Sequence, residues 1–177
     1  MTTLDAMNSV ADAIRAAAAD LLLEAAEAEA GDPKVPLAVD VGHAPPRNAD
    51  MSAYGSGYIA PRVVVGLDET GGIDSGTDAT VSLMVTVGTY STGTTRPDGT
   101  KDLNNQGYID LLLVIERIKR ALLRHPVLRH ITIQPPVRWG MYQDQPYPYW
   151  YGWLSFDAKI ATTPAQMDVP DNFLTLN

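Results

Sequence analysis

Few residues in this chain of 177 have the types and spacing that metal or nucleophilic chemistry requires. There is no cysteine, which excludes disulfides, thiolate zinc sites and cysteine nucleophiles. His43, His125 and His130 have no metal-ligand spacing, so surface or capping roles are favoured for them. The acids between Asp68 and Asp78 lack the alternation and terminal Glu of an EF-hand loop. No phosphate-binding loop, dinucleotide fingerprint or Gly-x-Ser-x-Gly elbow occurs, so we expect no metal, cofactor or catalytic residue.

One short run does match a catalytic pattern. Asp74, Ser75 and Gly76 fit the Asp-Ser/Thr-Gly sequence with which aspartic proteases hold two carboxylates that share one proton. A chain of this length would have to dimerise to supply the second Asp. The same residue types are those that turns select, and an alternating strand follows directly. We therefore interpret Asp74 as a turn residue and keep an aspartic-type protease as a distant alternative.

Charge is distributed unevenly along the chain, whose formal net charge is -8. Residues 1–80 hold thirteen acidic and four basic residues, whereas residues 81–177 hold eight acidic and nine basic ones. The overall charge argues against a whole-surface contact with nucleic acid. The second half contains a basic stretch: Arg117, Lys119, Arg120, Arg124, Arg129 and Arg138. Several of these lie in the last turns of an expected helix, where they complement its dipole.

Aromatic residues concentrate near the end of the chain, with eight of the thirteen between Trp139 and Phe156. In the expected strand 149–160, one face carries a core set: Trp150, Leu154, Phe156, Ala158 and Ile160. The other face carries a second set: Tyr149, Tyr151, Trp153, Ser155, Asp157 and Lys159. One domain core cannot easily cover both faces. Either the first helix covers the second face, or that face meets another protein, where Tyr and Trp are enriched.

Two helices are expected from apolar residues at three- and four-residue steps. The first spans residues 3–30, with Gly31 and Pro33 as its stop, and the second spans residues 106–124, where His125 and Pro126 end it. The expected capping residues are Thr2 with Asp5 for the first helix, and Asn104 or Asn105 for the second. A surface pair between Glu116 and Arg120 is also expected.

Alternation and turn residues define the expected strands and loops. The strands are 35–41, 58–68, 79–88, 128–134, 138–142 and 149–160. The long loops are 42–57, 68–78 and 91–105, the last with a turn at residues 97–99. The order of helix, strands, helix and strands predicts an α+β domain in which two helices pack on a mainly antiparallel sheet. We assign residues 1–162 to this single domain and residues 163–177 to an extended C-terminal arm.

The chain shows no targeting or membrane signal. Its first thirty residues lack a basic segment followed by a compact apolar one, so no secretory signal is expected. Uninterrupted apolar runs, such as residues 16–19 and 21–23, are far shorter than a membrane span. We expect a soluble protein that is made in a cytoplasm.

Two segments carry a resemblance to a known family. Residues 106–118 form the apolar start of the second helix, and residues 145–152 contain the run Tyr-Pro-Tyr-Trp that opens the last strand. A strand ending in Gly88-Thr89-Tyr90 leads through a polar loop into that helix. Together these features resemble tail terminator (tail-completion or minor tail) proteins of long-tailed bacteriophages and prophages. The resemblance covers roughly residues 80–160.

The resemblance implies a structural virion protein rather than an enzyme. Such proteins are α+β subunits that close into a ring, commonly a homohexamer, at the head-proximal end of the tail tube. There they stop tube polymerisation and offer a docking surface to the connector or neck protein of the head. The partners implied are therefore other copies of the chain, the tail tube protein and the connector, with DNA only passing through the ring. The implied location is the virion tail, after synthesis in the host cytoplasm.

Two sets of residues are candidates for these contacts. The subunit or partner interface is expected at Tyr147, Tyr149, Tyr151 and Trp153. Residues that could face the lumen or a partner are Arg117, Arg120 and Arg124. A neck or head–tail joining protein is the closest alternative, because it too is a small, ring-forming α+β protein. The protease that would use Asp74 is the distant one.

Overall fold

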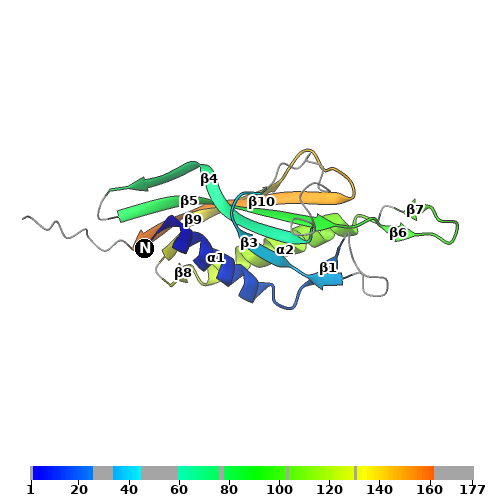
Figure 1. Cartoon of the computed structure of the whole chain (residues 1–177), viewed down its shortest axis with the longest axis horizontal. Coiled ribbons are helices and arrows are strands. Elements are labelled where there is room, and N and C mark those ends of the chain that lie inside the picture. The colour runs from blue at the N-terminus through cyan, green and yellow to red at the C-terminus, as the bar shows by residue number, and fades with distance from the viewer. Residues whose placement is uncertain are drawn as a thin grey trace, which may run out of the picture.

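Two helices cover one face of a curled, mostly antiparallel sheet in this computed structural model, which describes residues 2–25, 34–44, 60–75, 78–102, 104–129 and 131–161 (Figure 1). The helices are α1 (Thr3–Ala17) and α2 (Gln106–Arg124). The sheet order is β3 (Ala38–Val41), β4 (Arg62–Asp74), β5 (Asp78–Tyr90), β10 (Tyr149–Ala161), β9 (Ile131–Met141) and β8 (Val127–Leu128). Only the pair β3–β4 is parallel. The α+β prediction is confirmed.

Both helices contribute to one core on the same side of the sheet. Residues of α1 and α2 share a continuous apolar cluster with the inward positions of β4, β5, β9 and β10. Its largest fully buried side chains include Ile14, Leu83, Leu111, Ile115 and Phe156. Burying a side chain of this size contributes about 1.5–3 kcal/mol. The apolar stripes of the two helices are therefore buried together against one side of the sheet.

Helix α1 is shorter than the sequence pattern predicts. Its start is as expected, because the Thr2 hydroxyl accepts from the Asp5 N–H and the Asp5 carboxylate accepts from the Thr2 N–H in a capping box. The helix ends at Ala17, not at residue 30, and a turn leads into β1 (Leu22–Glu24), which pairs with β2 (Lys34–Pro36). An alanine-rich stretch has no side chain that marks a helix end, so the apolar periodicity predicts a helix that continues past the actual turn.

The expected strand 35–41 is split, and strand 58–68 is displaced toward the C-terminus. Leu37 separates β2 from β3, while β4 begins at Arg62 and continues to Asp74. The expected acidic turn therefore lies inside a strand, where four residues of β4 (68–71) stand opposite Ser82 of β5 as a bulge. Two glycines in this segment allow the backbone to leave the regular ladder, and Gly71 has a φ of +68°.

Strand β9 continues through a pair of prolines that was expected to separate two strands, 128–134 and 138–142. Its residues 135–137 stand opposite the single residue Phe156 of β10, which makes another bulge. The prolines are tolerated there because β8 pairs only with Ile131 and Thr132, so this part of β9 is an edge in the described residues. The expected strand 149–160 is confirmed as β10, and the expected strand 79–88 is confirmed within β5.

Helix α2 has the expected bounds, but two of its details differ. Asn105 is the N-cap with a φ of 55° and makes no side-chain capping bond, while the Asn104 amide oxygen accepts from the Gln106 N–H. Glu116 pairs with Lys119, one helical turn away, and not with Arg120 as expected. The loop before this helix contains the ribbon β6 (Thr94–Thr95) and β7 (Lys101–Asp102), closed by the expected turn at 97–99.

Three sequence expectations lie largely or wholly outside the described residues. These are the loop 42–57 beyond residue 44, the arm 163–177 and the expected helix beyond residue 25. Among the residues that the structure does describe, no helix is long and apolar enough to cross a membrane.

Candidate interaction surface

The second face of the sheet carries the aromatic row that the sequence predicted. Strand β10 turns Leu154 and Phe156 into the core, while Tyr151 and Trp153 lie on the other side, opposite Gly88 and Thr86 of β5. Helix α1 packs beside α2 on the core side, so the expectation that it covers the aromatic face is wrong (Figure 1). No described helix lies on this face, which we call the open face.

The aromatic rings of the open face form a contiguous group at one end of the sheet. Tyr90 and Tyr149, which are cross-strand neighbours, have ring centroids 5.2 Å apart, and Tyr149 stacks on Tyr151 at 6.4 Å. Burial raises the pKa of the Tyr90 hydroxyl above its usual value, and the nearby Tyr149, Glu24 and Tyr147 raise this pKa further. The group is therefore a half-buried apolar surface rather than a set of separate exposed rings.

Glycines on the neighbouring strands make room for two of these rings. A Cβ atom built on Gly88 would lie 2.9 Å from Cε1 of Tyr151, and one on Gly140 would lie 2.9 Å from Cζ2 of Trp153. The Trp153 ring thus lies across β9 at its unpaired edge. Any larger residue at these positions would lift the rings away from the sheet. The glycines keep the aromatic surface flat, which suits it to contact another protein.

The remaining half of the open face is polar and internally bonded. Asp68, in the β4 bulge, accepts a hydrogen bond from Ser155 of β10 at 2.9 Å, and Asp157 accepts one from Ser82 at 2.6 Å. Closer to the hairpin end, Lys159 pairs with Asp78 at 2.9 Å. These contacts pair Asp68, Asp157 and Asp78 with partners within the subunit.

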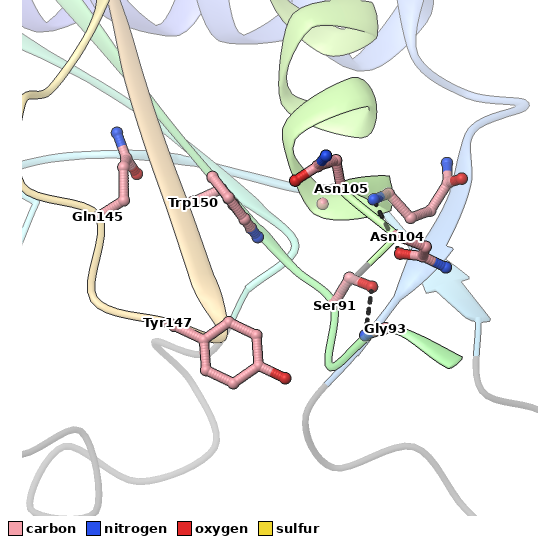
Figure 2. A pocket seen from close by; sticks show the side chains of 9 residues that line it. Ser91, Gly93, Asn104, Asn105, Gln145, Tyr147 and Trp150 are labelled. Atoms are coloured by element: carbon pink, nitrogen blue, oxygen red, sulfur yellow. Dashed lines mark hydrogen bonds between the residues drawn. The ribbon is translucent and has the colours of Figure 1, made fainter. Parts of the chain in front are cut away.

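Tyr147 lies apart from the aromatic row, in the loop before β10. Its hydroxyl donates to the Thr92 carbonyl at 2.8 Å, and its side chain is half exposed. Figure 2 shows Tyr147 and Trp150 facing the start of α2 across a pocket of about 180 Å³. The pocket is lined by Ser91, Gly93, Asn104, Asn105, Gln106, Gly107, Gln145, Tyr147 and Trp150.

This pocket offers uncharged hydrogen-bonding groups. Amides, hydroxyls and an indole line it, with no carboxylate, imidazole or ammonium among the lining residues. Trp150 packs edge-on against Tyr108, with centroids 6.0 Å apart, and beneath Gly107, whose carbonyl accepts from the Thr89 hydroxyl at 2.8 Å. The lining can hold the β10 loop against α2, and it holds no obvious general base or nucleophile.

The three arginines with an expected lumen or partner role lie on the outer side of α2. Arg117 is engaged within the chain, because its guanidinium donates to both carboxylate oxygens of Asp20 at 2.7 and 3.1 Å. These bonds hold the pKa of Asp20 below its usual value. Arg120 and Arg124 are exposed, and exposed Leu113 lies on the same side of the helix. Two of the three therefore remain available to a partner.

Trp139 was not among the residues predicted to form an interface. The register places it opposite Leu154, on the helix side of β9, where the Lys119 ammonium lies 4.8 Å from its ring centroid. Its side chain is 44% exposed, which is high for tryptophan. The bulge at 135–137 inserts two extra residues, so alternation counted from Ile131 still places Trp139 on the helix side. Alternation alone could therefore have found its side of the strand, although not its contact with Lys119.

Asp74 lies at the exposed end of β4, beside the hairpin turn. The Ser75 hydroxyl donates to the Asp78 carbonyl at 2.8 Å and accepts from the Asp78 N–H at 3.3 Å. These bonds are those of a turn. Asp74 itself is the last residue of β4 and pairs with Ala79, so the turn begins one residue later than the interpretation of Asp74 as a turn residue predicted. Within the described ranges, no group of three or more His, Asp or Glu side chains could hold a metal ion.

Comparison with known proteins adds no relative. No model of a known protein family matches the chain, and no curated protein matches it either.

Proposed function

We propose that this protein is a structural virion protein that forms a ring at the head-proximal end of a phage tail tube. The ring, of six copies by resemblance, stops tube polymerisation and presents a docking surface to the connector or neck protein of the head. DNA passes through it, and Arg120 and Arg124 face the lumen or a partner. The chain takes part in assembly and performs no catalysis.

The observation that carries this proposal is the aromatic half of the open face. Tyr149, Tyr151 and Trp153 belong to the segment that resembles tail terminators, and they occupy a sheet face that no described helix covers. Half-buried aromatic rings gathered on one face are typical of protein–protein contacts. A cap that ends a tube needs such a surface, because it must copy one of the two contacts that tube subunits make and withhold the other.

Imaging the purified protein tests the ring directly. We expect a ring with a central hole in electron micrographs, and a mass of several subunits by light scattering after gel filtration. A monomer or a compact dimer under all conditions would contradict the proposal. Arrest of tube growth by the added protein would assign the terminator role, whereas binding to the connector alone would assign the neck role.

Replacing Trp153 by alanine tests the open face. We expect Trp153→Ala to leave the subunit folded and to weaken assembly, because a buried interface aromatic typically contributes about 2 kcal/mol or more, roughly thirtyfold in affinity per contact. Light scattering gives the assembled mass, and circular dichroism reports whether the subunit is folded.

Trp150→Ala is the matched control on the opposite face of the same strand. Because Trp150 packs against the core and beneath α2, we expect this change to lower the free energy of unfolding by about 3–5 kcal/mol. We therefore expect Trp153→Ala to lower the assembled mass and Trp150→Ala to lower the stability of the folded subunit. A Trp153→Ala protein that unfolds, or that assembles normally, would show that the open face is not the interface.

A further inference from the structure

Two strands of the sheet, β9 and β4, each have a stretch with no outer neighbour, and these stretches lie at opposite corners of the described structure. On one side, β8 pairs only with the first residues of β9, which leaves residues 135–141 without an outer neighbour. On the other side, β3 pairs only with residues 62–65 of β4, which leaves residues 67–74 without one. An open edge of this length invites contact with another chain, and proteins usually cover or blunt it.

Two tryptophans flank the free part of β9, one on each face of the sheet. Trp139 lies on the helix side beside Lys119, and Trp153 lies across Gly140 on the open face. Exposed Arg138 precedes Trp139 on β9 and stands opposite Ser155 of β10. We call Arg138, Trp139, Gly140 and Trp153 the tryptophan edge. Its composition, two aromatic rings with an arginine, is the one most enriched among residues that dominate binding energy.

The free part of β4 has the complementary composition. Leu67 and Ile73 are 51% and 76% exposed, and their cross-strand partners place them on opposite faces of the sheet. Leu67 also lines a hollow of about 270 Å³ beside the start of α1. Between them, exposed Glu69 lies in the bulge. We call Leu67, Asp68, Glu69 and Ile73 the acidic edge.

The charges of the two edges are opposite. Residues 63–80 contain four acids and no base. The side of the molecule that carries the tryptophan edge holds Arg138, and α2, which packs on β9, adds exposed Arg120 and Arg124. Two copies placed side by side would therefore attract through unlike edges and repel through like ones.

Strand directions allow this contact without turning one copy over. Strands β4 and β9 run in opposite directions, because three successive antiparallel pairings separate them. A second copy in the same orientation thus meets the first as an antiparallel neighbour, with helix side next to helix side. The bulge at 68–71 interrupts the acidic edge, so we expect side-chain docking there rather than a continuous ladder.

We infer that this chain associates with itself head to tail, with the tryptophan edge of one copy docked on the acidic edge of the next. The free parts of the two edges lie at different heights along the sheet, so each copy is displaced along the strands relative to its neighbour. Such a contact closes into a ring only when the strands are inclined to the ring axis. Closure into a ring rests on the proposed function, whereas the edge contact does not.

Charge exchange tests the pairing of unlike edges. We expect Arg138→Glu alone and Glu69→Arg alone each to weaken self-association about tenfold or more, because each places like charges across the contact. The double variant should regain the wild-type affinity. An equimolar mixture of the two single variants should also associate, since alternating copies restore unlike charges at every contact.

Several outcomes would overturn the inference. It fails if the wild-type protein is monomeric, if the single variants associate normally, or if neither the double variant nor the mixture recovers. Arg138→Glu could abolish association that an equimolar mixture with Glu69→Arg does not restore. That result would indicate a symmetric contact of one edge with itself. A ring that persists in both single variants would refute the edge contact and leave the proposed function standing.

Cross-linking provides an independent test, because the chain has no cysteine of its own. In a protein with Glu69→Cys and Arg138→Cys, a short thiol-specific cross-linker should produce a ladder of covalent oligomers that ends at the ring size. Each single-cysteine protein should remain uncross-linked. The control pair Asp102→Cys with Arg138→Cys should give no ladder, and a ladder from that pair alone would contradict the inference.

Discussion

At the scale of single residues, the close contacts of glycines with aromatic rings decide the shape of the candidate surface. Gly88 and Gly140 allow Tyr151 and Trp153 to lie flat on the open face, and Gly107 allows Trp150 to pack beneath the start of α2. Glycine is required at these positions because an aromatic ring lies directly above each one, not because the backbone angles are unusual. Their substitution should therefore act through displaced rings.

Gly107→Ala provides the sharpest test of this view. In a helix this change normally stabilises by about 1 kcal/mol, but here the new Cβ would lie 2.5 Å from Nε1 of Trp150. We expect overpacking to outweigh helix propensity and to lower the free energy of unfolding by about 1–2 kcal/mol in urea denaturation. Ile109→Ala, on the exposed side of the same helix, is the control and should change stability by about 0.5 kcal/mol or less. An unchanged or more stable Gly107→Ala protein would mean that Trp150 is not held there.

At the scale of elements, neighbouring residues determine the start of α1, whereas a distant segment determines its end. The capping box at Thr2 and Asp5 was predictable from spacing alone, whereas the end of α1 at Ala17 was not. The chain leaves the helix there to form the ribbon β1–β2, which depends on a segment more than ten residues away. Polar side chains mark the start of this helix, and distant pairing determines its end.

Thr2→Ala tests the energetic role of the α1 cap. Loss of the hydroxyl leaves the Asp5 N–H without its acceptor, so we expect a loss of about 1 kcal/mol. For a chain of this size, that corresponds to a decrease in Tm of about 2–4 °C by differential scanning calorimetry. Asn8→Ala, at an exposed position within the same helix, should not lower Tm. Equal Tm values for Thr2→Ala and the wild type would show that the start of α1 contributes no stability.

At the scale of the whole molecule, the separation of charge distinguishes the two sides of the sheet. Acids gather on the free part of β4, and exposed basic residues gather on β9 and the outer side of α2. Trp139 and Trp153 add apolar surface on the basic side. Self-association through these sides should thus combine apolar burial with an electrostatic attraction that salt can screen.

Ionic strength separates these two contributions. We expect the dissociation constant for self-association to rise as NaCl is increased from about 0.05 to 0.5 M, since the screening length falls well below 10 Å. Sedimentation equilibrium measures this constant. The double variant Glu69→Gln with Arg138→Gln should show a flatter salt dependence. Association that strengthens with salt in the wild type would indicate that charge attraction has no part in the contact.

The sequence alone determined the features that depend on neighbouring residues. Alternation specified β5 and both faces of β10, apolar periodicity specified α2, and the turn at 97–99 followed from its residue types. Each of these rests on a period or a turn that a few adjacent residues set, so no distant contact was needed to predict it.

Only the tertiary structure decided which surfaces stay uncovered. The sequence could not tell whether α1 covers the aromatic face, because either helix stripe can pack on either side of a sheet. It also could not show that the Trp139 ring lies beside Lys119, or that Asp68 accepts a hydrogen bond from Ser155, 87 residues away. Packing of distant segments sets which face is buried, so the open face and its two unlike edges emerge only when the chain is folded.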